Sequence, residues 1–130
     1  MDHTAIAELL GLNKEIVKTI IKGVRTPEGA RNLYEKVRRV APKIEPAAMK
    51  LWEKLTVEAI AKTSRIDNWK KLYEDSPESM RPAILEHWIL DAKIILAEEN
   101  FKDQKRASFV FKNVPEELKI EIILKIARDI

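Results

Sequence analysis

The chain has 130 residues and a net charge of +3; 45% of its residues are apolar and 35% are charged. This composition suits one folded domain, or a small domain with a helical extension, and excludes a mainly disordered chain. The chain contains no cysteine, which excludes disulfides, thiolate nucleophiles and cysteine-based metal sites. It has only three glycines, and it is rich in Ile, Leu, Ala, Glu and Lys, so we expect an all-α fold.

The sequence predicts a cytoplasmic protein that does not enter a membrane. Its first residues, MDHTAIAELL, lack the basic head and the long apolar core of a signal peptide. No apolar run approaches the roughly 18 residues that a membrane helix needs. The absence of cysteine fits a reducing compartment.

Positive charge is concentrated in the first half of the chain. Residues 1–65 carry 13 Lys and Arg against 8 Asp and Glu, whereas residues 66–130 carry 11 against 13. A basic half indicates a polyanionic partner such as a nucleic acid. The alternative is that the lysines only solvate helix faces, and charge alone leaves both interpretations open.

Apolar spacing predicts three helices in the first 40 residues, over about 5–10, 14–22 and 27–40. Gly11 supplies the turn between the first two, and Asn13 caps the second. Gly23 ends that second helix. The pair Thr26–Pro27 is a strong start signal for the third, because proline fits the first helical position.

The rest of the chain predicts further helices, over about 46–63, in a short stretch after Asp67, over 82–98 and over 115–128. The helix at 82–98 is the most apolar. Residues 100–112 are ambiguous, because the Phe-Val-Phe triplet they contain suits either a strand or a helix. The segment Pro42–Pro46 is the most favoured position for a boundary between two domains. We therefore expect an N-terminal unit over 1–42 and a helical domain over 46–130, unless the two form one continuous bundle.

The stretch AIAELLGLNKEIVKTIIKG near the N-terminus meets the physical demands of a helix-turn-helix. That motif needs a small residue where two helices cross, a turn residue that tolerates positive φ, and a second helix with a polar outer face. Ala7 supplies the small residue and Gly11 the turn. Val17 and Ile20 are expected to face inward from the second helix. The residues left on its outer face are Asn13, Lys14, Glu15, Lys18, Thr19 and Lys22.

On these residues the stretch resembles the helix-turn-helix DNA-binding superfamily, most closely the three-helix headpiece of LacI-type repressors. Thr4 corresponds to the capping threonine of that headpiece, and the step Gly23-Val24-Arg25-Thr26-Pro27 is similar to one in phage-repressor domains. The resemblance covers residues 3–42 and implies that helix 13–22 enters the major groove, with base contacts from its outer face and phosphate contacts around it. The DNA-binding residues that it implies are Asn13, Lys14, Glu15, Lys18, Thr19, Lys22, Arg25 and Arg31.

The resemblance implies a small regulator of transcription, or a plasmid- or phage-type factor, that binds double-stranded DNA. We expect it to form a homodimer, because a single short recognition helix binds weakly and paired half-sites are the usual remedy. The wide apolar faces predicted at 82–98 and 115–128 offer surface for dimerisation or for a protein partner.

The alternative is a helical protein–protein adaptor with no nucleic-acid role. An αα-hairpin inside a bundle needs the same glycine turn and much the same apolar spacing. Ile16 and Ile21 widen the apolar side of the second helix, which would allow residues 46–130 to cover it. The outer face of helix 13–22 separates the two interpretations. If Lys14, Lys18 and Lys22 are exposed and Ile16 is the only apolar residue on that face, DNA binding is favoured. If that face packs against residues 46–130, the adaptor is favoured.

No cofactor and no catalytic activity are expected. His87 and Asp91 lie one helical turn apart, yet two ligands do not make a site, and His87 is expected to be structural. The three tryptophans are expected in the core rather than stacked on bases. The basic and aromatic residues at 101–112 suggest a more distant alternative, a single-stranded RNA site, although a solvated loop anchored by aromatics is favoured.

Overall fold

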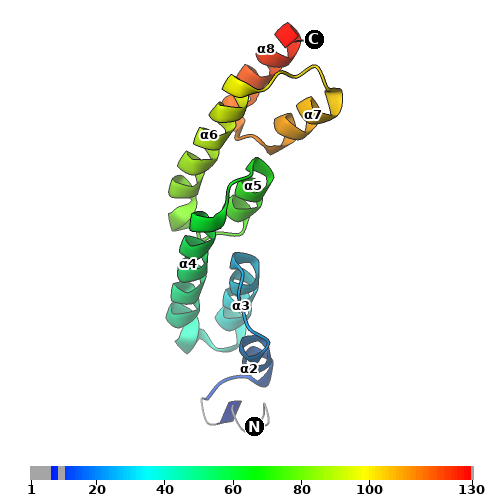
Figure 1. Ribbon diagram of the computed structural model, residues 1–130. Coiled ribbons are helices and arrows are strands. Elements are labelled where there is room, and N and C mark those ends of the chain that lie inside the picture. Colours follow the sequence, from blue (N-terminus) through cyan, green and yellow to red (C-terminus); the bar gives the residue numbers. More distant parts are fainter. Residues whose placement is uncertain (1–6, 9–10, 130) are drawn as a thin grey trace. The chain divides into compact units, whose positions relative to one another are not determined.

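The structure is a computed structural model that describes residues 7–8 and 11–129 (Figure 1). The predicted all-α fold is confirmed, since the described residues contain helices and turns and no β-strand. Three short 3-10 turns, at Pro42–Ile44, Glu78–Met80 and Glu116–Leu118, connect the helices. Within the described ranges the α-helices are α2 (Lys14–Ile21), α3 (Pro27–Val40), α4 (Glu45–Lys62), α5 (Ile66–Glu74), α6 (Arg81–Glu98), α7 (Gln104–Asn113) and α8 (Lys119–Asp129).

The chain divides into two compact units. The N-terminal unit comprises the chain up to Ala61 together with Asp75–Glu78, and the C-terminal unit comprises Lys62–Glu74 and the chain from Ser79 onwards. The expected boundary at Pro42–Pro46 therefore falls inside the first unit. It does so because α4 contributes to the same core as α2 and α3.

The core of the N-terminal unit is formed where α2, α3 and α4 meet. Ile16 of α2, Leu33 and Val37 of α3 and Ala48 of α4 are all buried and pack together. Burial of such apolar surface is the main term that holds amphipathic helices together, at about 25 cal/mol per Å². The start of α3 is the predicted one, because the Thr26 hydroxyl accepts the Gly29 N–H at 3.1 Å.

The segment Asp75–Glu78 belongs to the N-terminal unit although it lies between α5 and α6 in sequence. The indole N–H of Trp52 donates to the main-chain oxygen of Asp75 at 2.7 Å. The Asp75 carboxylate pairs with the guanidinium of Arg31 at 2.8 Å. Ser76 and Pro77 are buried beside it. Two side chains of α3 and α4 thus anchor this segment.

The tryptophans are buried, as the sequence predicts. Trp69 of α5 and Trp88 of α6 are buried in the C-terminal unit, and Trp52 is buried in the N-terminal unit. The indole N–H of Trp88 donates to the main-chain oxygen of Asn113, at the end of α7, at 2.8 Å. Phe101 is fully buried ahead of α7. The tryptophans therefore act as core residues whose polar edge is satisfied by main chain or by carboxylate.

The ambiguous stretch 100–112 is helical over most of its length. The Asp103 carboxylate caps α7 by accepting the Lys105 N–H at 2.9 Å. Val110, in the middle of the Phe-Val-Phe triplet, is fully buried, whereas Phe109 and Phe111 beside it are partly exposed. Among the described residues, no helix combines the length and apolar character needed to cross a bilayer.

Candidate nucleic-acid interface

The turn that precedes α2 is built on a glycine, as both the helix-turn-helix and the αα-hairpin interpretations require. Gly11 has φ of +65°, in the left-handed region that favours glycine. The Leu12 N–H donates to the Ala7 oxygen at 2.8 Å, and the Gly11 N–H donates to the Glu8 oxygen at 3.3 Å. These two bonds are the Schellman pattern of a helix C-terminus. Ala7 is buried as expected, whereas Thr4 lies outside the described residues.

The polar side chains at the start of α2 support the helix itself. The Asn13 side-chain oxygen accepts the Glu15 N–H at 2.8 Å, which caps α2 as predicted. The Thr19 hydroxyl donates to the Glu15 oxygen at 2.9 Å. Asn13 therefore keeps its two amide N–H donors and one oxygen lone pair, and Thr19 keeps its acceptor lone pairs.

The inward face of α2 differs in part from the expected one. Val17 is 2% exposed, as predicted, but Ile16 is fully buried and takes the central position in the core. The prediction that Ile20 faces inward is wrong, because Ile20 is 45% exposed and Ile21 is 50% exposed. The core lies under the first half of α2, and the last turn of the helix extends beyond it.

The solvent face of α2 carries a row of lysines. Lys14, Lys18 and Lys22 follow at four-residue spacing, so they lie along one side of the helix. Lys14 and Lys22 are exposed and Lys18 is half-buried. None of the three forms an ion pair with another described residue. The exposure predicted for a DNA-binding helix is therefore found at Lys14 and Lys22 and in part at Lys18. The expectation that Ile16 is the only apolar residue outside is wrong, because Ile16 is buried and Ile20 and Ile21 are exposed.

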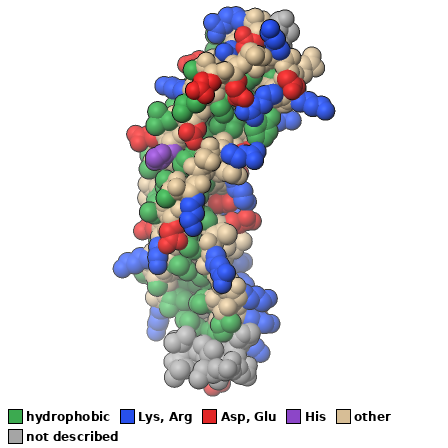
Figure 2. Space-filling model, viewed as in Figure 1, with side chains coloured by type: hydrophobic (Ala, Val, Ile, Leu, Met, Phe, Trp, Pro, Cys, Tyr) green, Lys and Arg blue, Asp and Glu red, His purple; other side chains and the backbone are tan. Residues whose placement is uncertain are grey.

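The basic character extends beyond α2 into α3. Residues 13–43 contain nine Lys and Arg against three Glu, a balance of +6. Figure 2 shows Lys and Arg side chains gathered along the side of α2 and α3. Arg38 and Arg39, which are both exposed at the end of α3, were not among the predicted DNA-binding residues. The sequence signal that could have pointed to these two residues is the arginine doublet in the last turn of an amphipathic helix.

Of the two arginines implied as phosphate contacts, only Arg25 remains a candidate. Arg25 is exposed in the loop after α2, and its side chain lies close to Gly23, where an added Cβ would be 3.2 Å from the Arg25 Nε. Arg31 is instead paired with the Asp75 carboxylate, whose side chain is 9% exposed. Arg31 therefore supports the fold and is not counted among the candidate interface residues.

A hydrogen bond between α3 and α4 lies near the arginine doublet. The Tyr34 hydroxyl donates to the Glu45 carboxylate at 2.7 Å. This bond raises the pKa of Tyr34 above its ordinary value of 10.0. Partial burial and the charge of Glu45 act in the same direction on that pKa, and Arg38 opposes them. Arg38 also lies over the Tyr34 ring, with its guanidinium carbon 5.8 Å from the ring centre.

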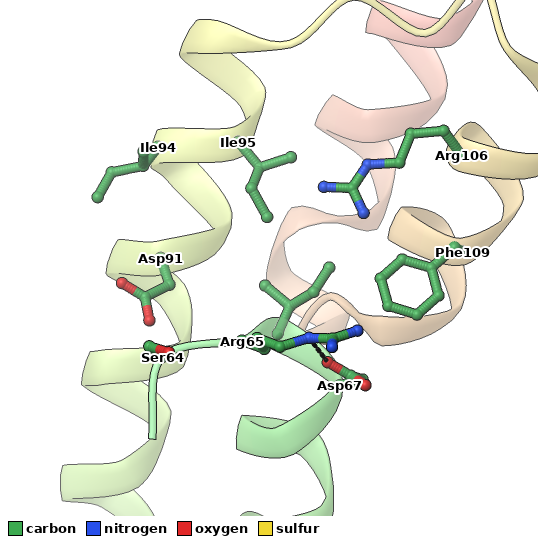
Figure 3. A pocket seen from close by; sticks show the side chains of 9 residues that line it. Ser64, Arg65, Asp67, Asp91, Ile94, Ile95, Arg106 and Phe109 are labelled. Carbon is green, nitrogen blue, oxygen red and sulfur yellow. Dashed lines mark ion pairs between the residues drawn. The ribbon is translucent and has the colours of Figure 1, made fainter. Parts of the chain in front are cut away.

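The C-terminal unit contains a cavity of about 340 Å³ at the start of α5 (Figure 3). Arg106 reaches into it from α7, and Arg65 lies beside Asp67 at its edge. The Arg106 guanidinium donates twice to the Glu99 carboxylate, at 3.0 and 2.8 Å. The Asp91 carboxylate accepts the Trp69 indole N–H. Because these charged side chains are already paired within the chain, we assign no ligand to this cavity.

His87 and Asp91, which lie one helical turn apart on α6, have structural roles. Asp91 is bonded to Trp69, and the His87 ring stacks on Trp69 with centroids 5.3 Å apart and planes 5° apart. Across the described part of the chain, no three His, Asp or Glu side chains come together as a metal site requires.

Comparisons with protein-family models, with curated proteins and with solved structures found no match to this chain. Any function assigned to α2 therefore rests on its own residues and their surroundings.

Proposed function

We propose that the N-terminal unit binds double-stranded DNA through α2 and that the protein acts as a small transcription regulator. The observation that carries this proposal is the lysine row Lys14, Lys18 and Lys22, which lies on the solvent side of a helix whose other side buries Ile16 and Val17. A helix of this kind, held by a glycine turn before it, is the element that such proteins insert into the major groove.

The chemistry of the row suits phosphate oxygens. Lysine ammonium groups bind phosphates as point charges, and each phosphate that they neutralise releases counterions from the duplex. Lys14, at the start of α2, and Lys18, one turn later, lie closest to the groove floor in this arrangement. Lys22 and Arg25 flank the backbone. Ile21 is 50% exposed and lies beside the lysine row on the helix, so it suits apolar contact with thymine methyl groups.

The test is a fluorescence-anisotropy titration with a random duplex over a salt series. We expect binding with Kd of about 1–100 µM that weakens steeply with salt, as nonspecific binding does. The triple variant Lys14→Ala/Lys18→Ala/Lys22→Ala should lower the affinity. It should also reduce the slope of log K against log salt by up to about 3, since each phosphate contact contributes about 0.9.

The matched control is Lys50→Ala/Lys54→Ala/Lys62→Ala, which removes the same charge from exposed positions of α4. Both triple variants lower the net charge equally, so a purely global electrostatic effect would weaken binding equally. Equal weakening, or no binding by the parent protein, would overturn the proposal.

The half-exposed Ile20 and Ile21 favour a second candidate function, which is a protein–protein adaptor that uses the last turn of α2. Exposed apolar side chains grouped on one turn are typical of a partner-binding surface. This candidate predicts no salt-sensitive DNA binding in the same titration.

A further inference from the structure

Helix α6 is apolar on two opposite sides. One side buries Ile84, Trp88 and Ala92 within the C-terminal unit. The other side exposes Leu90, which is 60% accessible, and Ile94, which is 52% accessible. A helix that is apolar all round normally has both sides covered, so the outer side of α6 lacks a partner within its unit.

The outer side of α6 has a regular pattern. Ala83, Leu90 and Ala97 follow at seven-residue spacing and are all exposed, so they form one stripe along the helix. The small alanines at its ends allow a second helix to approach closely, and the leucine at its centre supplies the apolar contact. Glu86 and Lys93 are also seven residues apart and exposed, and they run along one edge of this stripe.

We propose that the outer side of α6 pairs with α6 of a second copy of this chain, antiparallel and with Leu90 at the two-fold axis. A two-fold axis brings the same edge of both helices together, because the surface patch must complement itself. Glu86 of each copy then lies opposite Lys93 of the other, so two ion pairs flank the Leu90 contact. A parallel arrangement would instead place Glu86 level with its own counterpart.

The surroundings of Lys93 fit this occupant. A cavity of about 490 Å³ lies between α6 and α8. Three basic side chains line it against a single acidic one, Glu121. Lys125 is paired with Asp129 at 3.8 Å, so Lys93 and Arg128 are the cations that favour an incoming carboxylate such as Glu86 of the second copy. Leu124 of α8 is 58% exposed beside the cavity and adds apolar surface next to the stripe. The basic residues are Lys93, Lys125 and Arg128.

The dimer gives the proposed DNA-binding unit two copies for paired half-sites. The pairing itself needs no DNA and is tested without it, so its failure is distinguishable from failure of the DNA proposal.

The test is sedimentation equilibrium of the full chain at about 50 µM, a concentration chosen to populate a micromolar dimer. We expect the parent protein to be dimeric. Lys93→Glu and Glu86→Lys should each place like charges opposite one another at both contacts and weaken the dimer roughly 10- to 100-fold. The double variant Glu86→Lys/Lys93→Glu restores opposite charges and should recover the dimer.

An equimolar mixture of the two single variants gives the sharpest result. One variant then presents two lysines and the other two glutamates, so we expect a mixed dimer although each variant alone is weakened. This outcome also shows that both variants are folded. The control Lys102→Glu makes the same charge change at an exposed residue away from α6 and should leave the dimer intact.

Three outcomes would overturn the proposal. The first is a monomeric parent protein at this concentration. The second is a dimer that Lys93→Glu and Glu86→Lys leave unchanged, which would place the interface elsewhere. The third is a pair of single variants that neither the double variant nor the mixture rescues.

Discussion

At Gly11 the backbone adopts φ of +65°, a conformation that costs a residue with a Cβ about 1 kcal/mol. An added Cβ would meet no atom within 4 Å, so the cost of substitution there is conformational and not steric. We expect Gly11→Ala to lower the free energy of unfolding by about 1 kcal/mol in urea denaturation. Gly11→Asn should lose less, because asparagine tolerates the left-handed region. An asparagine variant as unstable as the alanine variant would show that another factor governs this turn.

At Tyr34 the relevant quantity is the pKa of the hydroxyl, which the hydrogen bond to Glu45 raises above 10.0. A raised pKa means that folding favours the neutral phenol. The resulting stabilisation is fully present below the unfolded-state pKa of about 10 and is lost as the pH rises through the folded-state value. We expect Glu45→Ala to shift the tyrosinate absorbance of Tyr34 to lower pH. Tyr34→Phe identifies the phase that belongs to this residue, and an unshifted phase in Glu45→Ala would contradict the assignment.

The orientation of α2 can be tested by comparing two isoleucines on the same side of the helix. Ile16 is fully buried among α3 and α4, whereas Ile20 is 45% exposed one turn later. We expect Ile16→Ala to lower the free energy of unfolding by about 2–5 kcal/mol, through lost burial and the cavity left behind. Ile20→Ala should cost about 0.5 kcal/mol or less, as at most surface sites. Similar losses for the two variants, measured by urea denaturation, would mean that α2 is packed along its whole length.

Helix limits were predictable because their signals are local. Thr26 and Pro27 start α3, and Asn13 starts α2, each through a bond or a fixed φ within a few residues. The helix at 104–113 also has a local signal in Asp103, but the apolar triplet after it suits strand and helix equally. The prediction that Ile20 is buried was wrong for a different reason. Its exposure depends on how far α3 and α4 extend along α2, which is a tertiary property.

The candidate interface was predictable to a similar extent. The lysine row follows from periodicity alone, because residues four apart share a side of a helix. The pairing of Arg31 was not predictable, since Asp75 is distant in sequence and reaches Arg31 only when the segment after α5 joins the N-terminal unit. Sequence alone therefore cannot separate an arginine that binds phosphate from one that forms an ion pair with a residue distant in sequence.

At the scale of the whole molecule, the pair Arg31–Asp75 fixes the segment Asp75–Glu78, which follows α5 and precedes α6 in sequence but belongs to the N-terminal unit. The Asp75 side chain is 9% exposed, so removal of Arg31 leaves a largely buried carboxylate without its cation. A double-mutant cycle with Arg31→Ala and Asp75→Ala should give a coupling energy of about 1–3 kcal/mol.

The matched comparison for that cycle is Arg65–Asp67, an ion pair at 3.2 Å whose arginine is 67% exposed. Solvent screens such a pair, so we expect its coupling energy to be about 0–1 kcal/mol in the same urea measurements. Equal coupling in the two cycles would mean that burial of Asp75 adds nothing and that the segment is held by Trp52 and its other contacts. A larger coupling for Arg31 and Asp75 would identify this ion pair as a main anchor of the segment. This ion pair would then explain why Arg31, although it lies in the middle of the basic stretch, is not part of the surface that we propose binds DNA.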